Sequence, residues 1–273
     1  MKNPHGSLKI GWFSTGRGEG SRGLLLSVLS AIQSGTLDAS IEFVFCNREP
    51  GEDAGTDNFL NLVSNHDIPV VYLSSRRFAR ERNVRFEDVR RLYDEEVVSM
   101  LSDFSAQTCV LAGYMLIVST LLCERYKLLN LHPAKPSGPI GTWREVIDVL
   151  IKQRATESGT MIHLATEHVD KGPVLSYCTF SIRNSSDEHL WVKLDQAENG
   201  PHQPGPVNET REELFRLIRS RQLQYEQPFV VETLRAFADH RISRSSLLPA
   251  IPVDLTEQVN AIFNVGKMNS ASQ

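Results

Sequence analysis

The chain has 273 residues, of which 41% are hydrophobic and 23% charged, the composition of a soluble protein with a substantial buried core. Lysine and arginine together number 29, aspartate and glutamate 33, and the formal net charge is −4. A general nucleic-acid binder presents excess positive charge, so the composition argues against that class. The four cysteines are scattered without a CxxC pair, which argues against a disulfide scaffold and a zinc knuckle and predicts reduced thiols.

The longest mainly apolar run, residues 110–122, is interrupted by Gly, Ser and Thr and is too short to span a bilayer. Residues 1–7 lack the apolar core of a signal peptide. We therefore expect a cytoplasmic protein without membrane association, and both a monomer and a homodimer fit the sequence.

Short apolar runs alternate with segments of helical period along the first 165 residues. Strands are predicted at 8–14, 41–46, 69–73, 108–112 and 127–131, and helices at 24–32, 58–64 and 86–100. Continuous apolar strands separated by helices are typical of a parallel sheet covered on both faces. The sequence therefore predicts an open, mostly parallel, Rossmann-like twisted α/β sheet with helices on both faces.

The pattern changes after residue 142. A helix is predicted at 143–154, two strands at 159–165 and 173–182, and a long helix at 211–239 with a kink at Pro228. Residues 184–210 are polar and hold three prolines and two glycines, which predicts a loop or insertion. We thus expect a single domain over 8–241, a polar insertion at about 184–210, and a C-terminal tail over 244–273.

A glycine-rich stretch follows the first predicted strand and opens the first helix. Residues 18–23 (GEGSRG) fit the pattern G-x-G-x-x-G, in which backbone N–H groups and the helix dipole favour an anion. A dinucleotide site would want an acid at the end of the second strand, where Arg48 stands instead. An NADP site, a single phosphate monoester and a ligand-free turn are all open at this point.

A second motif lies at the end of the fifth predicted strand. Asn130 and His132 are two residues apart in an extended segment, so both side chains point to the same face. Pro133 keeps His132 extended. An amide and an imidazole side by side can stabilise negative charge that develops on a carbonyl oxygen. The simpler alternative is a pair of strand-end residues bonded to the backbone.

Residues 159–174 (GTMIHLATEHVDKGPV) add His163 on a strand and Asp170 on the loop after it. An aspartate beside an imidazole orients the ring and stabilises its charged form. Taken alone, Asp170 is equally well explained as a turn residue before Lys-Gly-Pro.

Together these motifs resemble the folate-dependent formyltransferases, and within them the members that formylate phosphoribosylglycinamide (GAR). The segments that carry the resemblance run in the family's order from residue 8 to about 241, and they are KIGWFSTGRGEGS, VRRLYDEEV, VLAGYMLIVS, LLNLHP, GTMIHLATEHVDKGPV and FVVETLRAFADHRI. The resemblance implies transfer of a formyl group from 10-formyltetrahydrofolate to a primary amine without a metal. It implies small-molecule substrates, GAR as the acceptor, and a place in purine synthesis and one-carbon metabolism.

The resemblance also implies roles for individual residues. Asn130 and His132 would stabilise the oxyanion, and Asp170 would support His132 and assist proton transfer. The acceptor's phosphate would lie on Gly20, Ser21 and Arg22. The residues expected at the folate site are Arg90, Tyr114, Met115, Leu116, His163 and Val169.

Three departures from the family keep other functions open. Leu116 replaces a usual arginine, Leu223 stands where an acid would meet the GAR ribose, and the loop after Pro133 is altered. These departures motivate formylation of another amine, such as a nucleotide-linked amino sugar, and a folate- or nucleotide-binding module that has lost catalysis. A hydrolase that releases formate to water and an NADP oxidoreductase are further alternatives.

Overall fold

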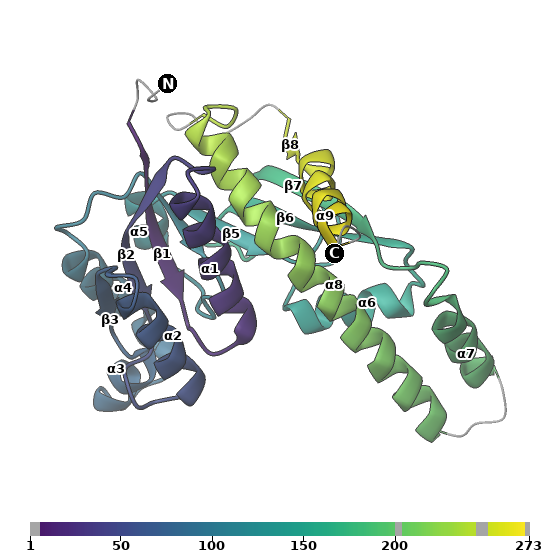
Figure 1. Cartoon of the computed structure of the whole chain (residues 1–273). Helices are drawn as coiled ribbons and strands as arrows, with labels where there is room; N and C mark the ends of the chain where they lie inside the picture. The colour runs from purple at the N-terminus through teal and green to yellow at the C-terminus, as the bar shows by residue number, and fades with distance from the viewer. Residues whose placement is uncertain (1–5, 200–203, 244–250, 271–273) are drawn as a thin grey trace.

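The computed structural model describes residues 6–199, 204–243 and 251–270, with the backbone alone at 204–206 and 264–270. Within these residues one sheet of eight strands runs through the molecule in the order β3-β2-β1-β4-β5-β6-β7-β8 (Figure 1). The strands are β1 (Leu8–Ser14), β2 (Ala39–Cys46), β3 (Val70–Tyr72), β4 (Thr108–Leu111), β5 (Leu128–His132), β6 (Glu157–Leu164), β7 (Val174–Ser181) and β8 (Val253–Asp254).

The five strands from β3 to β5 are parallel to their neighbours, whereas β6 is antiparallel to both β5 and β7. The predicted open, mostly parallel sheet is therefore confirmed. The strand order reverses between β1 and β4, because β2 lies on one side of β1 and β4 on the other. In open α/β sheets ligands bind outside the carboxyl ends of the strands at such a reversal.

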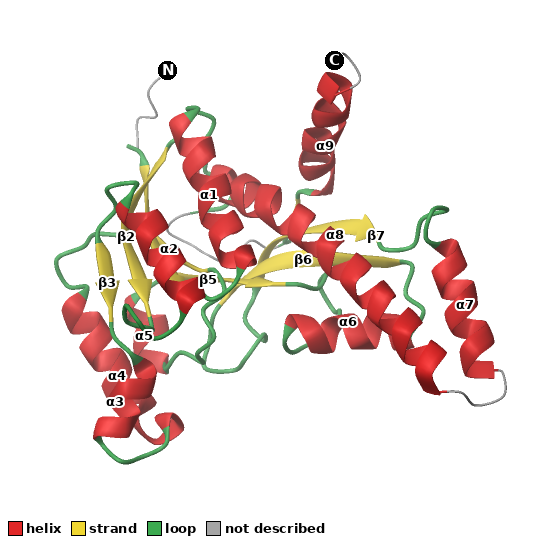
Figure 2. Cartoon of the chain, turned by 60° about the horizontal axis from the view of Figure 1, so that its bottom comes forward, coloured by secondary structure: helices red, strands yellow, loops and turns green. Residues whose placement is uncertain are grey.

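Helices cover both faces of the sheet (Figure 2). They are α1 (Glu19–Gln33), α2 (Ala54–Ser64), α3 (Ser75–Glu81), α4 (Phe86–Met100), α5 (Thr120–Arg125), α6 (Trp143–Lys152), α7 (Glu188–Asn199), α8 (Pro204–Ala238) and α9 (Thr256–Ser270). The alternation of side chains along a strand explains the two layers. Trp12 packs in a core with α1, α2 and α8, and its neighbour Phe13 packs in a second core with α3, α4 and α5.

The prediction of a loop at 184–210 was wrong for most of the residues described there, while 200–203 lie outside the described residues. Residues 188–199 form α7, and α8 already begins at Pro204. Leu190, Trp191 and Leu194 are buried in a third core with α6 and α8, so three apolar contacts outweigh the polar composition that predicted a loop. Val192, which follows Trp191 in the same helix, is 44% exposed.

Three further expectations need correction. Helix α3 was missed because its sequence, SRRFARE, is short and rich in charge. Helix α8 begins at Pro204 rather than at the predicted residue 211, and it includes Pro228. The expected tail contains β8 and α9 within its described residues, while 244–250 and 271–273 lie outside them.

The four cysteines are free, as predicted. Burial raises the pKa of Cys46 and Cys123 to about 11 and that of Cys178 to about 12, which makes these thiols poor nucleophiles. Within the described ranges no helix is both long and apolar enough to cross a membrane.

Candidate active site

Asn130 and His132 lie at the carboxyl end of β5, and the antiparallel strand β6 places His163 directly opposite Asn130. The loop that follows β6 then returns Asp170 to the same point. The predicted shared face is confirmed, because Asn130 and His132 both contact the carboxylate of Asp170. The structure thus brings together four polar residues that are spread over 41 positions of the chain.

Asp170 is the centre of this cluster. Its Oδ2 lies 3.5 Å from His132 Nδ1, its Oδ1 lies 3.4 Å from His163 Nε2, and Asn130 Nδ2 donates to Oδ1 at 3.3 Å. The Gly141 N–H is a further donor. Burial alone would raise the pKa of Asp170, but the adjacent His163 and His132 rings and the Gly141 N–H outweigh it and lower the pKa below its ordinary value.

The partners of each imidazole fix where its protons lie. His163 Nδ1 is 2.9 Å from the Leu164 carbonyl, which can only accept, so Nδ1 carries a proton and Nε2 faces the Asn130 amide at 3.0 Å. His132 Nε2 is 2.9 Å from the Pro139 carbonyl and therefore also carries a proton. Its Nδ1 faces the Asp170 carboxylate, so only the doubly protonated ring donates to both oxygens.

All donors of this cluster are engaged by protein acceptors. Asn130 Nδ2 serves His163 and Asp170, and His132 Nε2 serves Pro139. A reacting oxygen must therefore displace at least one of these contacts. Catalytic hydrogen bonds commonly tighten around the substrate only in the complex, so the geometry is that of a resting site.

The turn that carries Asp170 has an uncommon backbone. Asp170 has φ 54°, in the left-handed region that aspartate tolerates better than most residues. Two residues later, a Cβ added to Gly172 would lie 1.7 Å from the Leu164 carbonyl oxygen. Only glycine allows this approach, and Leu164 is also the acceptor for His163. Sequence reasoning missed Gly172, although the DKGPV motif contains it.

The glycine-rich stretch lies on the same edge of the sheet, because β1, β4 and β5 are neighbours. Gly20, Ser21 and Arg22 form the first turn of α1, which begins at Glu19 rather than at the predicted residue 24. Gly18 caps this helix without a side-chain hydrogen bond. The turn therefore presents backbone donors and the positive end of the helix dipole.

Helix α8 supplies the wall opposite this turn. A Cβ on Gly20 would lie 3.1 Å from Leu223 and 3.6 Å from the Arg219 guanidinium. Arg219 pairs with the buried Glu226 at 2.9 Å. Sequence reasoning had not placed Arg219 here, since nothing in its local pattern reveals what a helix 200 residues away packs against.

A cavity of about 660 Å³ lies between α4 and the segments that begin α5 and follow β6. Arg90 lines it, and its Nε is buried without a hydrogen-bond partner in the described chain. Glu167 and Thr120, from opposite walls, hydrogen-bond at 2.9 Å. Cavities of this size are typical of small-molecule sites.

Of the six residues expected at the folate site, only Arg90 lines this cavity. Tyr114 is 7% exposed and packs edge-on against Phe13 in the core, so its expected contact with a ligand is corrected to a structural role. Leu116 packs on the same core, whereas Met115 and Val169 are exposed at 66% and 48%. His163 belongs to the Asp170 cluster instead.

Arg48 does not support a dinucleotide site. Its side chain is buried, and Nη1 donates to the Asn47 carbonyl at 2.7 Å and to Ser75 Oγ at 2.8 Å. A guanidinium engaged in this way is not presented to a 2′-phosphate. Among the described residues no group of three or more His, Cys, Asp or Glu side chains could hold a metal ion.

Comparison with known proteins adds to this geometry. Phosphoribosylglycinamide formyltransferase from Escherichia coli is 34% identical over 117 residues, which cover 41% of this chain and 53% of that protein. The matched region thus spans about half of that relative's length.

Two solved structures share the fold. Glycinamide ribonucleotide transformylase 1 from Symbiobacterium toebii has a TM-score of 0.63 at 19% identity, covering 88% of this chain and 91% of that one. A formyltetrahydrofolate deformylase from Pseudomonas syringae has a TM-score of 0.61 at 18% identity, covering 86% and 62%.

The family model described as formyl transferase matches residues 17–199. This range contains the first turn of α1, the Arg90 cavity and the whole Asp170 cluster. The chain belongs to the formyl transferase family.

Proposed function

We propose that this protein transfers the formyl group of 10-formyltetrahydrofolate to the primary amine of GAR. The observation that carries the proposal is the convergence of Asn130, His132 and Asp170 at the end of β5, within a formyl transferase domain. The name of the Escherichia coli relative supports GAR as the acceptor. The deformylase among the structural relatives makes water the competing acceptor to be tested.

Transfer requires stabilisation of charge on two atoms. When the amine attacks the formyl carbon, negative charge develops on the carbonyl oxygen and positive charge on the nitrogen. Asn130 Nδ2 and the Nε2–H group of His132 are the donors that can meet the oxygen. Both must exchange a present contact to do so, and for His132 Nε2 that contact is the Pro139 carbonyl.

Asp170 is the group suited to the proton on nitrogen. Its lowered pKa keeps it ionised near neutral pH, so it can accept a proton from the attacking amine, directly or through a water molecule. Its second task is to orient the His132 ring through the contact at Nδ1, 3.5 Å away. One residue thereby links the oxyanion donor to the proton acceptor.

The Arg90 cavity is suited to the formyl donor. Burying the Nε of Arg90 without a hydrogen-bond partner costs free energy, and an anion bound beside it would offset that cost. The glutamate carboxylates of a folate supply such an anion. Met115, which follows β4, and Val169, which precedes Asp170, are exposed apolar side chains. They can cover a ring system. Bound there, 10-formyltetrahydrofolate supplies an activated formyl group.

The first turn of α1 is suited to the acceptor's phosphate. Gly20 and Ser21 present backbone N–H groups, and among the described residues Arg22 pairs only with the exposed Glu19, at 4.0 Å. A phosphate at a helix N-terminus is favoured by both the free donors and the helix dipole.

The test is turnover of purified protein with 10-formyltetrahydrofolate, with and without GAR, followed by release of tetrahydrofolate. GAR-dependent turnover is expected, and Asn130→Ala should lower it about 100- to 1000-fold because a positioned oxyanion donor is lost. Folate binding should be retained in that variant. Unchanged turnover in Asn130→Ala would contradict the assigned role, and formate release without any amine would support the deformylase reaction instead.

A second acceptor is favoured by the α8 wall. Leu223 and Arg219 face Gly20, so this wall offers an apolar side chain and a guanidinium that is paired with the buried Glu226. A nucleotide-linked amino sugar, whose diphosphate carries more charge than a monoester, is the candidate. Turnover with such an amine and none with GAR would favour it, whereas folate binding without turnover on any amine would indicate a module that has lost catalysis.

A further inference from the structure

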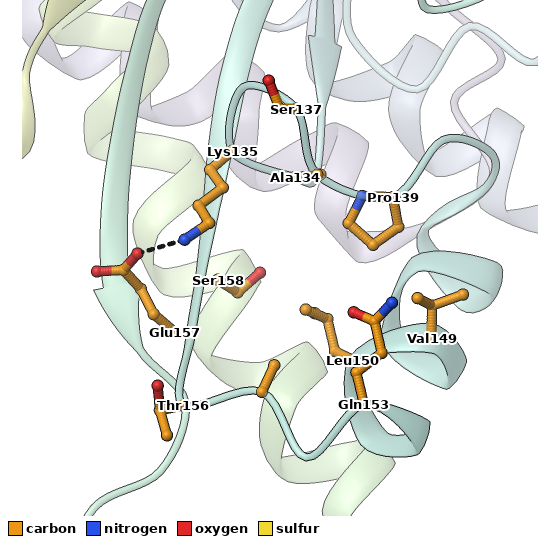
Figure 3. Close-up of a pocket in the computed structure, with 12 residues that line it drawn as sticks. Ala134, Lys135, Ser137, Pro139, Val149, Leu150, Gln153, Thr156, Glu157 and Ser158 are labelled. Carbon is orange, nitrogen blue, oxygen red and sulfur yellow. Dashed lines mark hydrogen bonds and ion pairs between the residues drawn. The ribbon is translucent and has the colours of Figure 1, made fainter.

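A second cavity of about 480 Å³ lies beside the loop that follows His132 (Figure 3). Its walls are the loop of residues 134–139, which follows His132, the last turns of α6 and the start of β6. It shares no residue with the Arg90 cavity or with the first turn of α1. The proposed reaction assigns it no task.

Ser158 is a buried polar residue in the wall of this cavity. Only 2% of the residue is exposed, and its Oγ has no hydrogen-bond partner in the described chain. Figure 3 shows the hydroxyl directed into the space between β6 and α6. A buried hydroxyl without a partner is unfavourable and rare in folded proteins, and a ligand group that reached this atom from the cavity would satisfy it.

The mouth of the cavity carries one charge of each sign. Lys135 Nζ and Glu157 Oε1 lie 2.7 Å apart (Figure 3), and each side chain is 44% exposed. An ion pair so exposed contributes little to stability, so its exchange for a ligand's charges is easy. Behind it, Leu150, Val149 and Pro139 form an apolar wall.

We propose that this cavity binds a free α-amino acid. The carboxylate would meet Lys135, the ammonium would meet Glu157, and the side chain would lie on the apolar wall with a polar atom at Ser158. A ligand with a single charge would replace only one half of this ion pair. A zwitterion satisfies both, and the cavity volume is within the range of small-molecule sites.

The same loop connects this cavity to catalysis. Pro139 lines the cavity, and its carbonyl holds His132 Nε2 at 2.9 Å. The loop is closed by the Gly138 N–H, which donates to the Lys135 carbonyl at 2.8 Å. The cavity is therefore present in the loop conformation in which the Pro139 carbonyl accepts from His132 Nε2, the proposed oxyanion donor. A ligand that binds this conformation stabilises it, so the amino acid acts as an inhibitor. This last step rests on the proposed function.

Binding is tested first, without reference to activity. The twenty amino acids are screened at millimolar concentration by thermal shift and then by calorimetry on the full chain. At least one should raise the unfolding midpoint, and its decarboxylated amine and its deaminated acid should not. Lys135→Met and Glu157→Gln should each abolish the shift. If no amino acid shifts the midpoint, or if the single-charge analogues bind as well, the proposal is wrong.

Ser158→Ala separates a ligand contact from a structural role. Because the hydroxyl has no partner, its removal should leave the unfolding midpoint of the free protein unchanged or higher, and should weaken binding at least tenfold. The exposed Ser30→Ala is the matched control and should bind as the parent does. A destabilised Ser158→Ala protein with undiminished affinity would contradict the site.

Activity is the second readout. The bound amino acid should lower kcat in the parent and leave it unchanged in Ser158→Ala at the same concentration. Binding without any effect on kcat would keep the site and refute the inhibitory coupling. If the protein transfers no formyl group to any acceptor, the binding result still decides the site.

Discussion

Gly172→Ala tests whether the turn after β6 sets the catalytic geometry. The added Cβ would lie 1.7 Å from the Leu164 carbonyl oxygen and 2.9 Å from its carbon. The turn must retreat by about 1.5 Å to restore an ordinary contact distance. Asp170 is two residues away, and Leu164 also accepts from His163, so both sides of the cluster move.

A displacement of about 1 Å at a catalytic group typically lowers the rate about 100-fold, and forced overpacking destabilises by about 1–3 kcal/mol. We therefore expect Gly172→Ala to lower kcat about 100-fold with a measurable fall in the unfolding midpoint. The assay is tetrahydrofolate release at saturating substrates, together with thermal unfolding by circular dichroism.

Gly35→Ala is the control for general destabilisation. Gly35 has φ +72° with nothing within 4 Å of its added Cβ, so alanine there is strained but meets no neighbour. It should lower stability by about 1 kcal/mol and leave kcat unchanged. Parent-like kcat in Gly172→Ala would refute the reasoning, as would an equal loss of kcat in both variants.

Three further outcomes are expected. Arg90→Met should raise the KM for the formyl donor at least tenfold, because it removes the buried unpaired nitrogen, while the exposed Arg216→Met, whose partner is Glu212, should not; equal effects would show that net charge alone matters. The folded-state pKa of Asp170 lies below its unfolded value, so its contribution to stability is complete above the unfolded pKa and is lost as pH falls through the folded pKa. Thermal unfolding midpoints of the parent and Asp170→Asn should therefore converge below about pH 4, and a constant difference at all pH values would contradict this. Burial raises the pKa of Cys46 to about 11, so this thiol should react with a thiol reagent only on unfolding, which kinetics of labelling with and without denaturant will check.

Local pattern was sufficient for most of the sheet. The strands of the first half, β1 to β5, are mainly apolar runs of three to eight residues, and their two faces pack in different cores, as Trp12 and Phe13 do. Such a pattern has no other stable arrangement than a sheet covered on both sides. Prediction failed where the pattern was weak, at α3 and α7, because these helices are held by a few buried contacts rather than by a long apolar stripe.

The catalytic cluster was predictable in part. The spacing of Asn130 and His132 in an extended segment places both on one face, because side chains alternate along a strand. The arrival of Asp170 between them depends on the pairing of β5 with β6 and on a turn that only Gly172 permits. Composition and spacing do not specify strand register across 33 residues, so the resemblance of the motif had to supply that link.

The sequence by itself determined the α/β class, the glycine-rich first turn and the identity of the polar residues at the end of β5, because these follow from local periodicity and backbone geometry. Only the tertiary structure decided three contacts. Tyr114 is buried in the core, Arg219 and Leu223 face Gly20, and the Pro139 carbonyl accepts a hydrogen bond from His132 Nε2. The reason is physical: these contacts join segments far apart in the chain, and their geometry is set by how strands and helices pack, which no local pattern encodes.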